Sequence, residues 1–449
     1  MKDTTQFLGK KVLILGLAKS GFAAAKLLSS LGAVVTVNDS SPDEGSKEIA
    51  ELRSEGIHVI CGGHPDGLLD EGFELVVKNP GIPYTNTVIK EAIRKEIPVW
   101  TEVEIASRIS EAPIIGITGS NGKTTTTTLL YHMLNVAKKK PLIAGNIGTV
   151  SCAVAETATK ENIIVLEASS FQLLGTDSFR PKIAIWTNVY DSHLDYHGSS
   201  AEYVKAKAHL LKNQTSEDYF IYNADQEVLR EVALTSNAIQ IPFTLKGKQQ
   251  KGISADESMI YWNGEPYVSR SIIKLPGEHN LENILSATAA AILSGCDKEP
   301  IESVLSSFTG VKHRMQFVKE LKGRKFYNDS KATNTLATKS ALAAFQTPTV
   351  LLAGGLDRGH SFEELRPFMG NVKAVIALGE TKKRFAEFAA SCEVEQIILA
   401  ENMVDAVRQA DLVSVEGDTV LLSPCCASWD EYASFEVRGN EFIEAVMSL

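Results

Sequence analysis

Short apolar runs alternate with amphipathic stretches along the first hundred residues. The run at Lys11–Leu15 predicts a buried strand, residues 20–30 have the spacing of an amphipathic helix, and Val34–Val37 and Leu75–Val77 predict further strands. Alternation of strand and helix is typical of a parallel sheet whose faces are covered by helices. We therefore expect the chain to begin with a Rossmann-like α/β domain.

The same alternation resumes after Pro113. Strands are expected at Ile114–Ile117, Ile163–Leu166 and Ile183–Trp186, and helices at Thr124–Asn135, Ala201–Leu211 and Leu281–Leu293. Between residues 243 and 270 polar and apolar positions alternate around the turn pair Asn263-Gly264, which predicts a small antiparallel excursion. A second α/β domain therefore follows the first.

A third α/β segment begins near Gly310. Its expected strands are Val350–Ala353, Ala374–Leu378 and Thr419–Leu422. Because 449 residues are too many for a single hydrophobic core, we divide the chain into domains at residues 1–110, 111–309 and 310–449.

Composition and charge narrow the class of protein. Lys plus Arg number 45 against 55 Asp plus Glu, a formal net charge of −10, which argues against a nucleic-acid partner because phosphate contacts need a basic surface. No apolar run of about 18 residues predicts a membrane span, and the apolar run near the start is too short for a signal peptide. The six cysteines are scattered without C-x-x-C spacing, so we expect reduced thiols, a cytoplasmic location and no membrane partner.

The segment Gly16-Leu17-Ala18-Lys19-Ser20-Gly21 follows a predicted strand and opens a helix, and Asp39 ends the next strand. This pattern is similar to the G-x-G-x-x-G dinucleotide motif with Ala18 at the second glycine. Three interpretations stay open here: a nicotinamide cofactor, another nucleotide or diphosphate at the helix N-terminus, and a tight turn without a ligand.

Residues 118–124 read Thr-Gly-Ser-Asn-Gly-Lys-Thr between a strand and a helix. Glycines let the backbone of such a loop surround phosphates, Lys123 can reach the β- and γ-phosphates, and Thr124 can offer its hydroxyl to Mg²⁺. The general P-loop pattern has a glycine where this chain has Ile117. The fold class we expect is α/β in three domains, with a central P-loop ATPase-like domain of parallel sheet between two Rossmann-like domains.

Most of the other polar positions have two interpretations. Glu167 ends a predicted strand and is either a magnesium ligand or a helix cap. Residues 193–197 (His-Leu-Asp-Tyr-His) suit either a zinc site or a surface turn, and Lys207 is by pattern a solvated helical lysine. Residues 329–334 form either an anion site together with residues 354–358, or a helix start capped by Asp329 or Ser330.

Together these motifs resemble the Mur ligase family, over essentially the whole chain. The matching segments are Thr118–Thr124, residues 167–170, 193–195, 203–207, 279–283, 313–314 and 329–334. Residues 422–430, continuing to 435–442, are similar to the members that add D-glutamate.

The resemblance implies an ATP-dependent ligase of peptidoglycan precursor synthesis that joins UDP-N-acetylmuramoyl-L-alanine to D-glutamate, with ATP and two Mg²⁺ ions. It implies that the first domain holds the UDP end, the second ATP and the third the amino acid, in a monomer.

The resemblance also implies roles for individual residues, with a separate group for each ligand. Catalytic residues are Lys123, His193 and Lys207, the last as a carbamylated lysine; metal ligands are Thr124, Glu167, His193 and Lys207. ATP is contacted by Gly119, Ser120, Asn121, Gly122, Lys123, Thr124, Thr125, Asn283, Arg314 and Asp329. The UDP-linked substrate is contacted by Lys19, Ser20, Asp39, Asn79, Gly81 and Asn146, and D-glutamate by Lys331, Thr333, Arg358, Ser428 and Phe435.

Two positions depart from the family pattern. Ser192 stands where the family usually has Asp, and Arg358 stands where some members have a lysine. Arg can pair with a carboxylate through two hydrogen bonds, but its reach differs from that of Lys.

Three rival functions remain. They are a nicotinamide oxidoreductase based on the Gly16–Gly21 turn, a regulatory P-loop module without catalysis, and a ligase of the same family that adds another amino acid.

Overall fold

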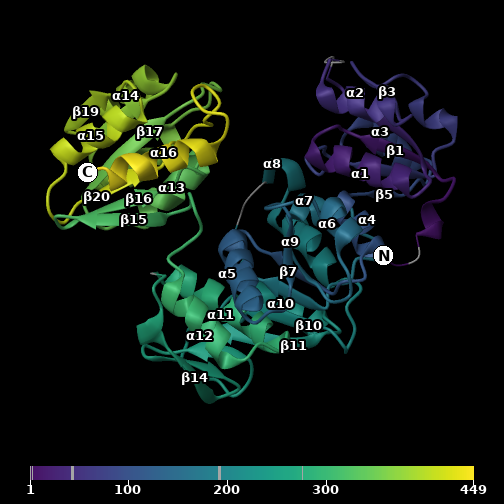
Figure 1. The fold of residues 1–449 in the computed structure, drawn as a ribbon, viewed down its shortest axis with the longest axis horizontal. Coiled ribbons are helices and arrows are strands. Elements are labelled where there is room, and N and C mark those ends of the chain that lie inside the picture. Colours follow the sequence, from purple (N-terminus) through teal and green to yellow (C-terminus); the bar gives the residue numbers. More distant parts are fainter. Residues whose placement is uncertain (1, 3, 42–44, 191–193, 276) are drawn as a thin grey trace. The chain divides into compact units, whose positions relative to one another are not determined.

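The computed structural model describes residues 2, 4–41, 45–190, 194–275 and 277–449. It separates into two compact units, Met1–Phe308 and Thr309–Leu449. The described residues form three β-sheets with helices between their strands; two sheets lie in the first unit and one in the second (Figure 1). The predicted three-domain α/β class is confirmed, while the predicted boundary near residue 110 stays a prediction.

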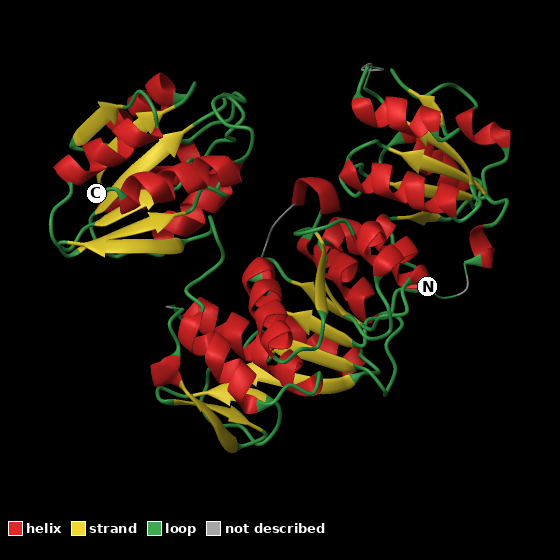
Figure 2. Ribbon diagram, viewed as in Figure 1, coloured by secondary structure: helices red, strands yellow, loops and turns green. Residues whose placement is uncertain are grey.

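The N-terminal sheet is parallel throughout the residues that the structure describes, in the order β3-β2-β1-β4-β5. Its elements are η1 (Thr5–Phe7), β1 (Lys11–Leu15), α1 (Lys19–Ser30), β2 (Val34–Asn38), α2 (Lys47–Ser54), β3 (His58–Ile60), η2 (Leu68–Glu71), β4 (Leu75–Lys78), α3 (Thr87–Arg94), β5 (Val99–Trp100) and α4 (Glu102–Ile109). Helices on both faces bury β1 from Val12 to Leu15, which explains its unbroken apolar run (Figure 2).

The central sheet has the order β14-β13-β12-β11-β10-β9-β6-β8-β7 among the described residues. Its strands and the helices that follow are β6 (Ile114–Thr118), α5 (Lys123–Val136), β7 (Pro141–Gly145), α6 (Ser151–Thr157), β8 (Ile163–Glu167), α7 (Ser170–Leu173), β9 (Ile183–Trp186), α8 (Leu194–His197), α9 (Ser200–Ala208), η3 (His209–Leu211), β10 (Tyr219–Asn223), α10 (Glu227–Thr235), β11 (Ile239–Thr244), β12 (Ile253–Ala255), β13 (Met259–Trp262), β14 (Glu265–Ser269), η4 (Arg270–Ile272), α11 (Glu278–Leu293) and α12 (Lys298–Ser307).

Strands β12, β13 and β14 pair antiparallel, and Asn263-Gly264 forms the turn between the last two, so the predicted excursion is confirmed. The helix expected at 201–211 ends at Ala208 and continues as a 3₁₀ turn.

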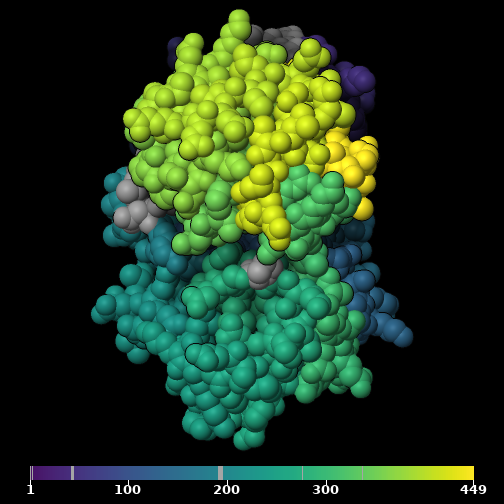
Figure 3. Space-filling model, turned by 90° about the vertical axis from the view of Figure 1, so that its left-hand side faces the viewer, coloured from purple at the N-terminus to yellow at the C-terminus, as the bar shows by residue number. Residues whose placement is uncertain are grey.

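The second unit holds a sheet of order β15-β16-β20-β17-β18-β19, in which only β15, of the strands described, runs antiparallel to its neighbour. Its elements are β15 (Gln316–Leu321), β16 (Arg324–Asn328), α13 (Thr335–Ala343), β17 (Thr349–Gly354), η5 (Glu363–Asn371), β18 (Val372–Leu378), α14 (Lys382–Ser391), β19 (Gln396–Leu399), α15 (Met403–Val413), β20 (Thr419–Leu422) and α16 (Phe435–Met447). In the space-filling view these residues are coloured green to yellow (Figure 3).

Among the described residues, no helix combines the length and the apolar character that crossing a membrane requires.

Helix α4 is anchored within the first unit by the buried carboxylate of Glu104. The carboxylate accepts hydrogen bonds from the backbone N–H groups of Asp177, Ser178 and Phe179, at 2.9, 3.0 and 3.1 Å. The Ser178 hydroxyl and the Arg108 guanidinium, each 2.6 Å away, also donate to it. Burial acts to raise the pKa of Glu104, but hydrogen bonds from Ser178 and Asp177 outweigh it and lower that pKa.

Replacing Glu104 by Gln should destabilise the first unit by about 2–4 kcal/mol, because an amide places a donor against backbone donors and removes the charge facing Arg108. Urea unfolding of Glu104→Gln checks this, with the exposed Glu257→Gln as control.

Because the pKa of Glu104 is lowered in the folded protein, its carboxylate adds stability that is fully present above the pKa of the unfolded chain. The destabilisation caused by Glu104→Gln should therefore be complete above about pH 4.5 and become smaller below it. Equal unfolding midpoints for the two variants at pH 7 would contradict the anchoring role of Glu104.

Candidate active site

The loop between β6 and α5 can be built only with glycine at two of its positions. Gly119 and Gly122 have φ of +152° and +80°. A Cβ at Gly119 would lie 1.9 Å from the Thr187 hydroxyl oxygen, and one at Gly122 would lie 2.0 Å from Oδ1 of Asn283. The loop is therefore packed against β9's end on one side and α11 on the other.

Residues that follow β9 fix the outer part of this loop. The N–H of Ser120 donates to the Asn188 carbonyl oxygen at 3.0 Å, and the N–H of Asn121 donates to Oδ1 of Asn188 at 2.8 Å. The Ser120 hydroxyl lies 3.0 Å from the Tyr190 carbonyl oxygen and 3.1 Å from the Tyr203 hydroxyl. The loop is thus held in one shape by side chains at the carboxyl edge of the sheet.

Two lysine ammonium groups converge on this loop. Nζ of Lys123 donates to the carbonyl oxygens of Gly119 at 2.8 Å and Ser120 at 3.0 Å. Nζ of Lys207, which is 1% exposed, donates to the same Gly119 oxygen at 2.9 Å. Burial, together with the charge of Lys123, holds the pKa of Lys207 well below its usual value, although the Glu167 carboxylate acts to raise it. The expected solvated helical lysine is in fact buried.

Glu167 ends β8 and is 1% exposed. Its Oε1 accepts a hydrogen bond from the Asn146 amide at 2.9 Å, whereas its Oε2 is buried without a hydrogen-bond partner among the described residues. Thr124, also buried, stands in the first turn of α5. An open carboxylate oxygen and a hydroxyl beside a phosphate loop suit Mg²⁺, which takes few protein ligands and completes its shell with water and substrate phosphates.

The segment that was expected to give a second metal ligand is only partly described. His193 and Ser192 lie outside the described residues. His197 is described: its Nε2 lies 2.9 Å from the Ser170 hydroxyl, and its ring stacks on Phe171 with centroids 5.3 Å apart. No cluster of three His, Cys, Asp or Glu side chains suited to a metal occurs in the described part of the chain.

The turn after β1 needs glycine at its first and last positions. A Cβ at Gly21 would lie 1.9 Å from the Gly16 carbonyl oxygen, and one at Gly16 would lie 2.8 Å from the Ile82 side chain. Ala18, at the middle position, is exposed and precedes α1. The Asp39 carboxylate accepts hydrogen bonds from the N–H groups of Leu17 at 2.6 Å and Ser41 at 2.8 Å, which fixes the turn.

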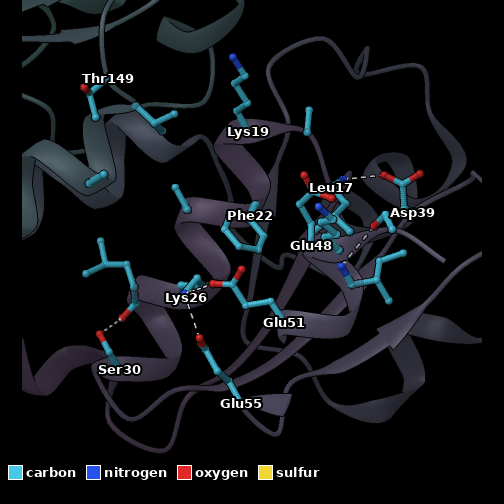
Figure 4. A pocket seen from close by; sticks show the side chains of 18 of the residues that line it. Leu17, Lys19, Phe22, Lys26, Ser30, Asp39, Glu48, Glu51, Glu55 and Thr149 are labelled. Carbon is cyan, nitrogen blue, oxygen red and sulfur yellow. Dashed lines mark hydrogen bonds and ion pairs between the residues drawn. The ribbon is translucent and has the colours of Figure 1, made fainter. Parts of the chain in front are cut away.

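This turn opens on a pocket of about 1160 Å³. Leu17, Lys19 and Asp39 line one end, Phe22 and Lys26 of α1 line its wall, and Thr149 comes from the central domain (Figure 4). Lys26 forms ion pairs with Glu51 and Glu55 of the facing segment, so its charge is already compensated. The structure therefore places two of the predicted UDP-site residues, Lys19 and Asp39, in one pocket.

The other predicted UDP-site residues lie in two places. Ser20, Asn79 and Gly81 are together: the Asn79 amide donates to the Ser20 hydroxyl at 3.1 Å, and the Gly81 N–H donates to Oδ1 of Asn79 at 3.1 Å. Asn146 instead contacts Glu167, through both its side chain and its backbone N–H.

In the second unit, Asp329 is buried and accepts hydrogen bonds from the Met315 N–H at 3.1 Å and the Ser423 hydroxyl at 3.0 Å. Burial raises the pKa of Asp329 to about 7, opposed by these bonds and by the charge of Arg314. The alternative that Asp329 or Ser330 caps a helix is wrong, because the cap of α13 is Asn334, whose side chain accepts from Ala337. Arg314 and Asp329 therefore lie together, in a different unit from the phosphate loop.

The segments predicted to hold the amino acid are joined by the buried guanidinium of Arg438, which is 1% exposed. Its Nε donates to the Ser330 hydroxyl at 3.0 Å, and its Nη2 donates to the carbonyl oxygens of Ser330 at 2.9 Å and Cys426 at 3.1 Å. One side chain thus connects the loop of Lys331 and Thr333 with the loop of Ser428.

The remaining predicted amino-acid residues lie on the same segments. Nζ of Lys331 lies 5.7 Å from the centre of the Phe435 ring. The Arg358 guanidinium lies 4.9 Å from the ring centre of Trp429, the residue after Ser428. The backbone N–H of Leu356 donates to the Ala427 carbonyl oxygen at 2.9 Å.

Three residues near this cluster have left-handed backbone without being glycine. They are His313, Met315 and Cys425, with φ of +62°, +44° and +64°. Such conformations are held only where the surroundings over-determine them. The His313 ring also fills the space beside Gly439, where a Cβ would lie 2.2 Å from its Nδ1.

Three family models cover most of the chain. They are described as "Mur ligase MurD-like, N-terminal domain" at residues 10–101, "Mur ligase middle domain" at residues 117–291 and "Mur ligase, glutamate ligase domain" at residues 313–426. The chain belongs to the Mur ligase family.

Similar Mur ligases include full-length relatives named UDP-N-acetylmuramoylalanine--D-glutamate ligase. The one from Geobacillus sp. (strain WCH70) is 54% identical over 450 residues and the one from Halalkalibacterium halodurans 53% identical over 449 residues, each covering 100% of both chains. A Listeria monocytogenes relative of that name is 52% identical, covering 100% of this chain and 99% of its own.

Solved Mur ligase structures have a similar fold at low identity. The UDP-N-acetylmuramate-alanine ligase MurC of Thermotoga maritima gives a TM-score of 0.57 at 20% identity, covering 98% of this chain and 99% of that one. The MurF ligase of Thermotoga maritima in complex with ADP gives 0.55 at 17% identity, covering 100% and 96%.

Some residues that shape this Mur ligase site were not predicted. Asn188 and Tyr190 directly follow the predicted strand at 183–186, and a polar side chain just after a parallel strand lies at the sheet's carboxyl edge, so a signal existed. Arg438 has no such signal, because it stands within a helix and its partners are 108 and 12 residues away in sequence.

Replacing Arg438 by Met should destabilise the second unit by about 2–4 kcal/mol, because the carbonyl groups of Ser330 and Cys426 lose their donor in a buried site. Urea unfolding followed by a probe of residues 309–449 measures this.

The control is Arg408→Met, whose exposed guanidinium forms an ion pair with Asp405 of its own helix, and the expected change is below about 0.5 kcal/mol. A similar small change for both variants would show that Arg438 does not hold these loops together.

Proposed function

We propose that this protein is the ATP-dependent amide ligase that adds D-glutamate to UDP-N-acetylmuramoyl-L-alanine in peptidoglycan precursor synthesis, with ADP and phosphate as products. The observation that carries the proposal is the full-length similarity, at 51–54% identity, to ligases named for this reaction. The phosphate loop with its two converging lysines supports it, since those side chains suit phosphoryl transfer.

In the first chemical step, a carboxylate oxygen of the L-alanyl group attacks the γ-phosphorus of ATP. A new P–O bond forms, the bond to the bridging oxygen breaks, and an acyl phosphate and ADP result. Both reactants are anions, so positive charge must stand at the transferring phosphoryl group. Lys123, at the start of α5, is the residue placed to supply it, as is the helix N-terminus itself.

Magnesium would be held here by Thr124 and Glu167, with His193 and Lys207 as further members of the site. When bound, the ion would offset the negative charge on the phosphate oxygens and orient them. The protein's own part is to aim the Glu167 carboxylate, which the Asn146 amide assists by its hydrogen bond to Oε1.

In the second step, the neutral amine of D-glutamate attacks the acyl-phosphate carbonyl carbon, a C–N bond forms and inorganic phosphate leaves with the C–O bond electrons. We propose that Lys331, Thr333, Arg358, Ser428 and Phe435 position the amino acid. Two cations among them, Lys331 and Arg358, match the two carboxylates of D-glutamate in number and sign. Asn283 and Arg314 are proposed to contact the adenine and the phosphates of ATP, and Asp329 is proposed to lie on the ribose side.

The UDP end is proposed to bind at the turn after β1. A pocket of about 1160 Å³ is large enough for a nucleotide, and Asp39 with the adjacent backbone offers hydrogen-bond groups at its end. Ala18, in place of the second glycine of the dinucleotide motif, is one reason to favour UDP over a nicotinamide cofactor.

Phosphate release should require ATP, UDP-N-acetylmuramoyl-L-alanine and D-glutamate together. A panel of D-glutamate, L-lysine, diaminopimelate and L-alanine, each added with the other two substrates, tests the choice of amino acid. Of these four amino acids, we expect only D-glutamate to give phosphate release. Lys123→Ala should lower kcat by at least about a hundredfold, because one charge on the transferring group is lost.

Lys205→Ala, an exposed residue on α9, serves as the matched control and should keep its activity. Release with another amino acid but not with D-glutamate would refute the substrate assignment. Binding of NADH without binding of ATP would refute the reaction class.

Lys207 is proposed to be carbamylated. A neutral amine adds CO₂ to form a carbamate and releases one proton, and burial lowers the pKa of Lys207, which favours the neutral amine. The product is an anion, which would remove the repulsion from Lys123 and provide an oxygen ligand for the metal site.

Depleting CO₂ should therefore lower activity by about tenfold or more, and bicarbonate should restore it, as expected when a group that supports a metal site is lost. Carbon-13 NMR with labelled bicarbonate should show a carbamate signal that is missing in Lys207→Arg. Unchanged activity without CO₂, together with no such signal in the wild type, would exclude the modification.

A further inference from the structure

Lys78, the last residue of β4, is a buried cation without a carboxylate partner among its described contacts. It is 1% exposed. Its ammonium group donates to the carbonyl oxygens of Ile82 at 2.9 Å, Pro80 at 3.1 Å and Asn79 at 3.4 Å. The lysine therefore folds back under the loop that follows it and holds three of its carbonyl groups at one point.

Two tyrosines complete the surroundings of this ammonium. The Tyr196 hydroxyl, from α8 of the central domain, lies 3.4 Å from Nζ of Lys78 and donates to the Ile82 carbonyl oxygen at 3.2 Å. The Tyr84 ring lies with its centre 5.0 Å from Nζ, and its hydroxyl donates to the Leu174 carbonyl oxygen at 3.2 Å. Both contacts tie the loop to the central domain of the same unit.

The other side of the loop meets the proposed UDP turn. Asn79 donates to the Ser20 hydroxyl, and the absent side chain of Gly16 leaves the space that Asn79 and Ile82 fill. Tyr196 in turn packs edge-on against Phe171, with ring centres 4.5 Å apart, four residues beyond Glu167. Lys78 thus lies between the nucleotide turn and the segment that follows the proposed metal ligand.

A buried ammonium is an unfavourable way to fill space. Its transfer from water costs several kcal/mol even after relaxation, and an apolar side chain of similar size would usually fold as well or better. The ammonium makes physical sense if the loop must hold a particular shape, because its three N–H donors match the three carbonyl oxygens of the loop.

We propose that Lys78 is a positioning residue, which holds residues 79–82 in the shape that binds the sugar nucleotide and fastens that loop to α8. This inference rests on the proposed function, since it assigns Asn79 and Gly81 to that substrate. Lys78 acts through the loop and touches no reacting atom.

The test compares Lys78→Met with Lys90→Met, an exposed lysine on α3. We expect Lys78→Met to raise the Kd for UDP-N-acetylmuramoyl-L-alanine, measured by calorimetry, and its KM by about tenfold. The KM for ATP should stay within about twofold of the wild type, and Lys90→Met should behave as wild type. Tyr196→Phe, which removes only a hydroxyl, should raise the Kd for the sugar nucleotide in the same direction by a smaller factor.

A pH series separates positioning from simple packing. The titratable groups facing Lys78 among the described residues are Tyr84 and Tyr196, and burial raises the pKa of each to about 12, so neither changes charge near neutrality. Burial lowers the pKa of Lys78 to about 7. The wild-type Kd for the sugar nucleotide should therefore rise as the pH increases from 6 to 8.5, since the amine loses its charge, while that of Lys78→Met stays constant.

Each outcome decides the matter. Wild-type affinity in Lys78→Met, or an equal rise in the KM values for ATP and for the sugar nucleotide, would overturn the positioning role. If Lys78→Met does not fold, the inference stands or falls on the wild-type pH series and on Tyr196→Phe. Failure of the wild type itself to bind UDP-N-acetylmuramoyl-L-alanine would instead reject the proposed function.

Discussion

Two ammonium groups, those of Lys123 and Lys207, share one carbonyl oxygen, that of Gly119. Two like charges this close and this poorly hydrated cannot both stay charged without an anion nearby. Negative charge offsets this repulsion: the Glu167 carboxylate acts to raise the pKa of Lys207, and the proposed nucleotide phosphate and carbamate would add to it. The glycine loop and the strand ends around it bring these groups within reach of one another.

Local signals in the sequence were enough to predict the most buried strands of each sheet and the glycine loop at residues 118–124. The strands at 11–15, 114–117, 183–186 and 419–422 are continuous apolar runs, because both faces of each are covered, and the glycines at 119 and 122 are required by backbone shape. The strands that went unpredicted, such as β7 with its glycine and proline ends, carry weaker patterns.

Long-range partners set the limit of prediction. By pattern Lys207 is one more lysine on a helix, and only the fold shows that its side chain points under the loop. Lys78 and Arg438 likewise draw carbonyl groups of neighbouring loops together, and their partners are chosen by chain packing that no short motif encodes. Family resemblance supplied the roles of Lys207 and Asn283, and no pattern supplied those of Lys78 and Arg438.

The left-handed backbone at His313, Met315 and Cys425 has a consequence for engineering. Replacing any of them by glycine would relieve the backbone strain but remove a packed side chain, since His313 fills the space beside Gly439 and Cys425 belongs to the core. The strain is therefore held in place by packing beside the loops that Arg438 joins. A library meant to raise the heat tolerance of this region should leave these three positions unchanged, because the cavity that each replacement opens would cost more than the relieved strain returns.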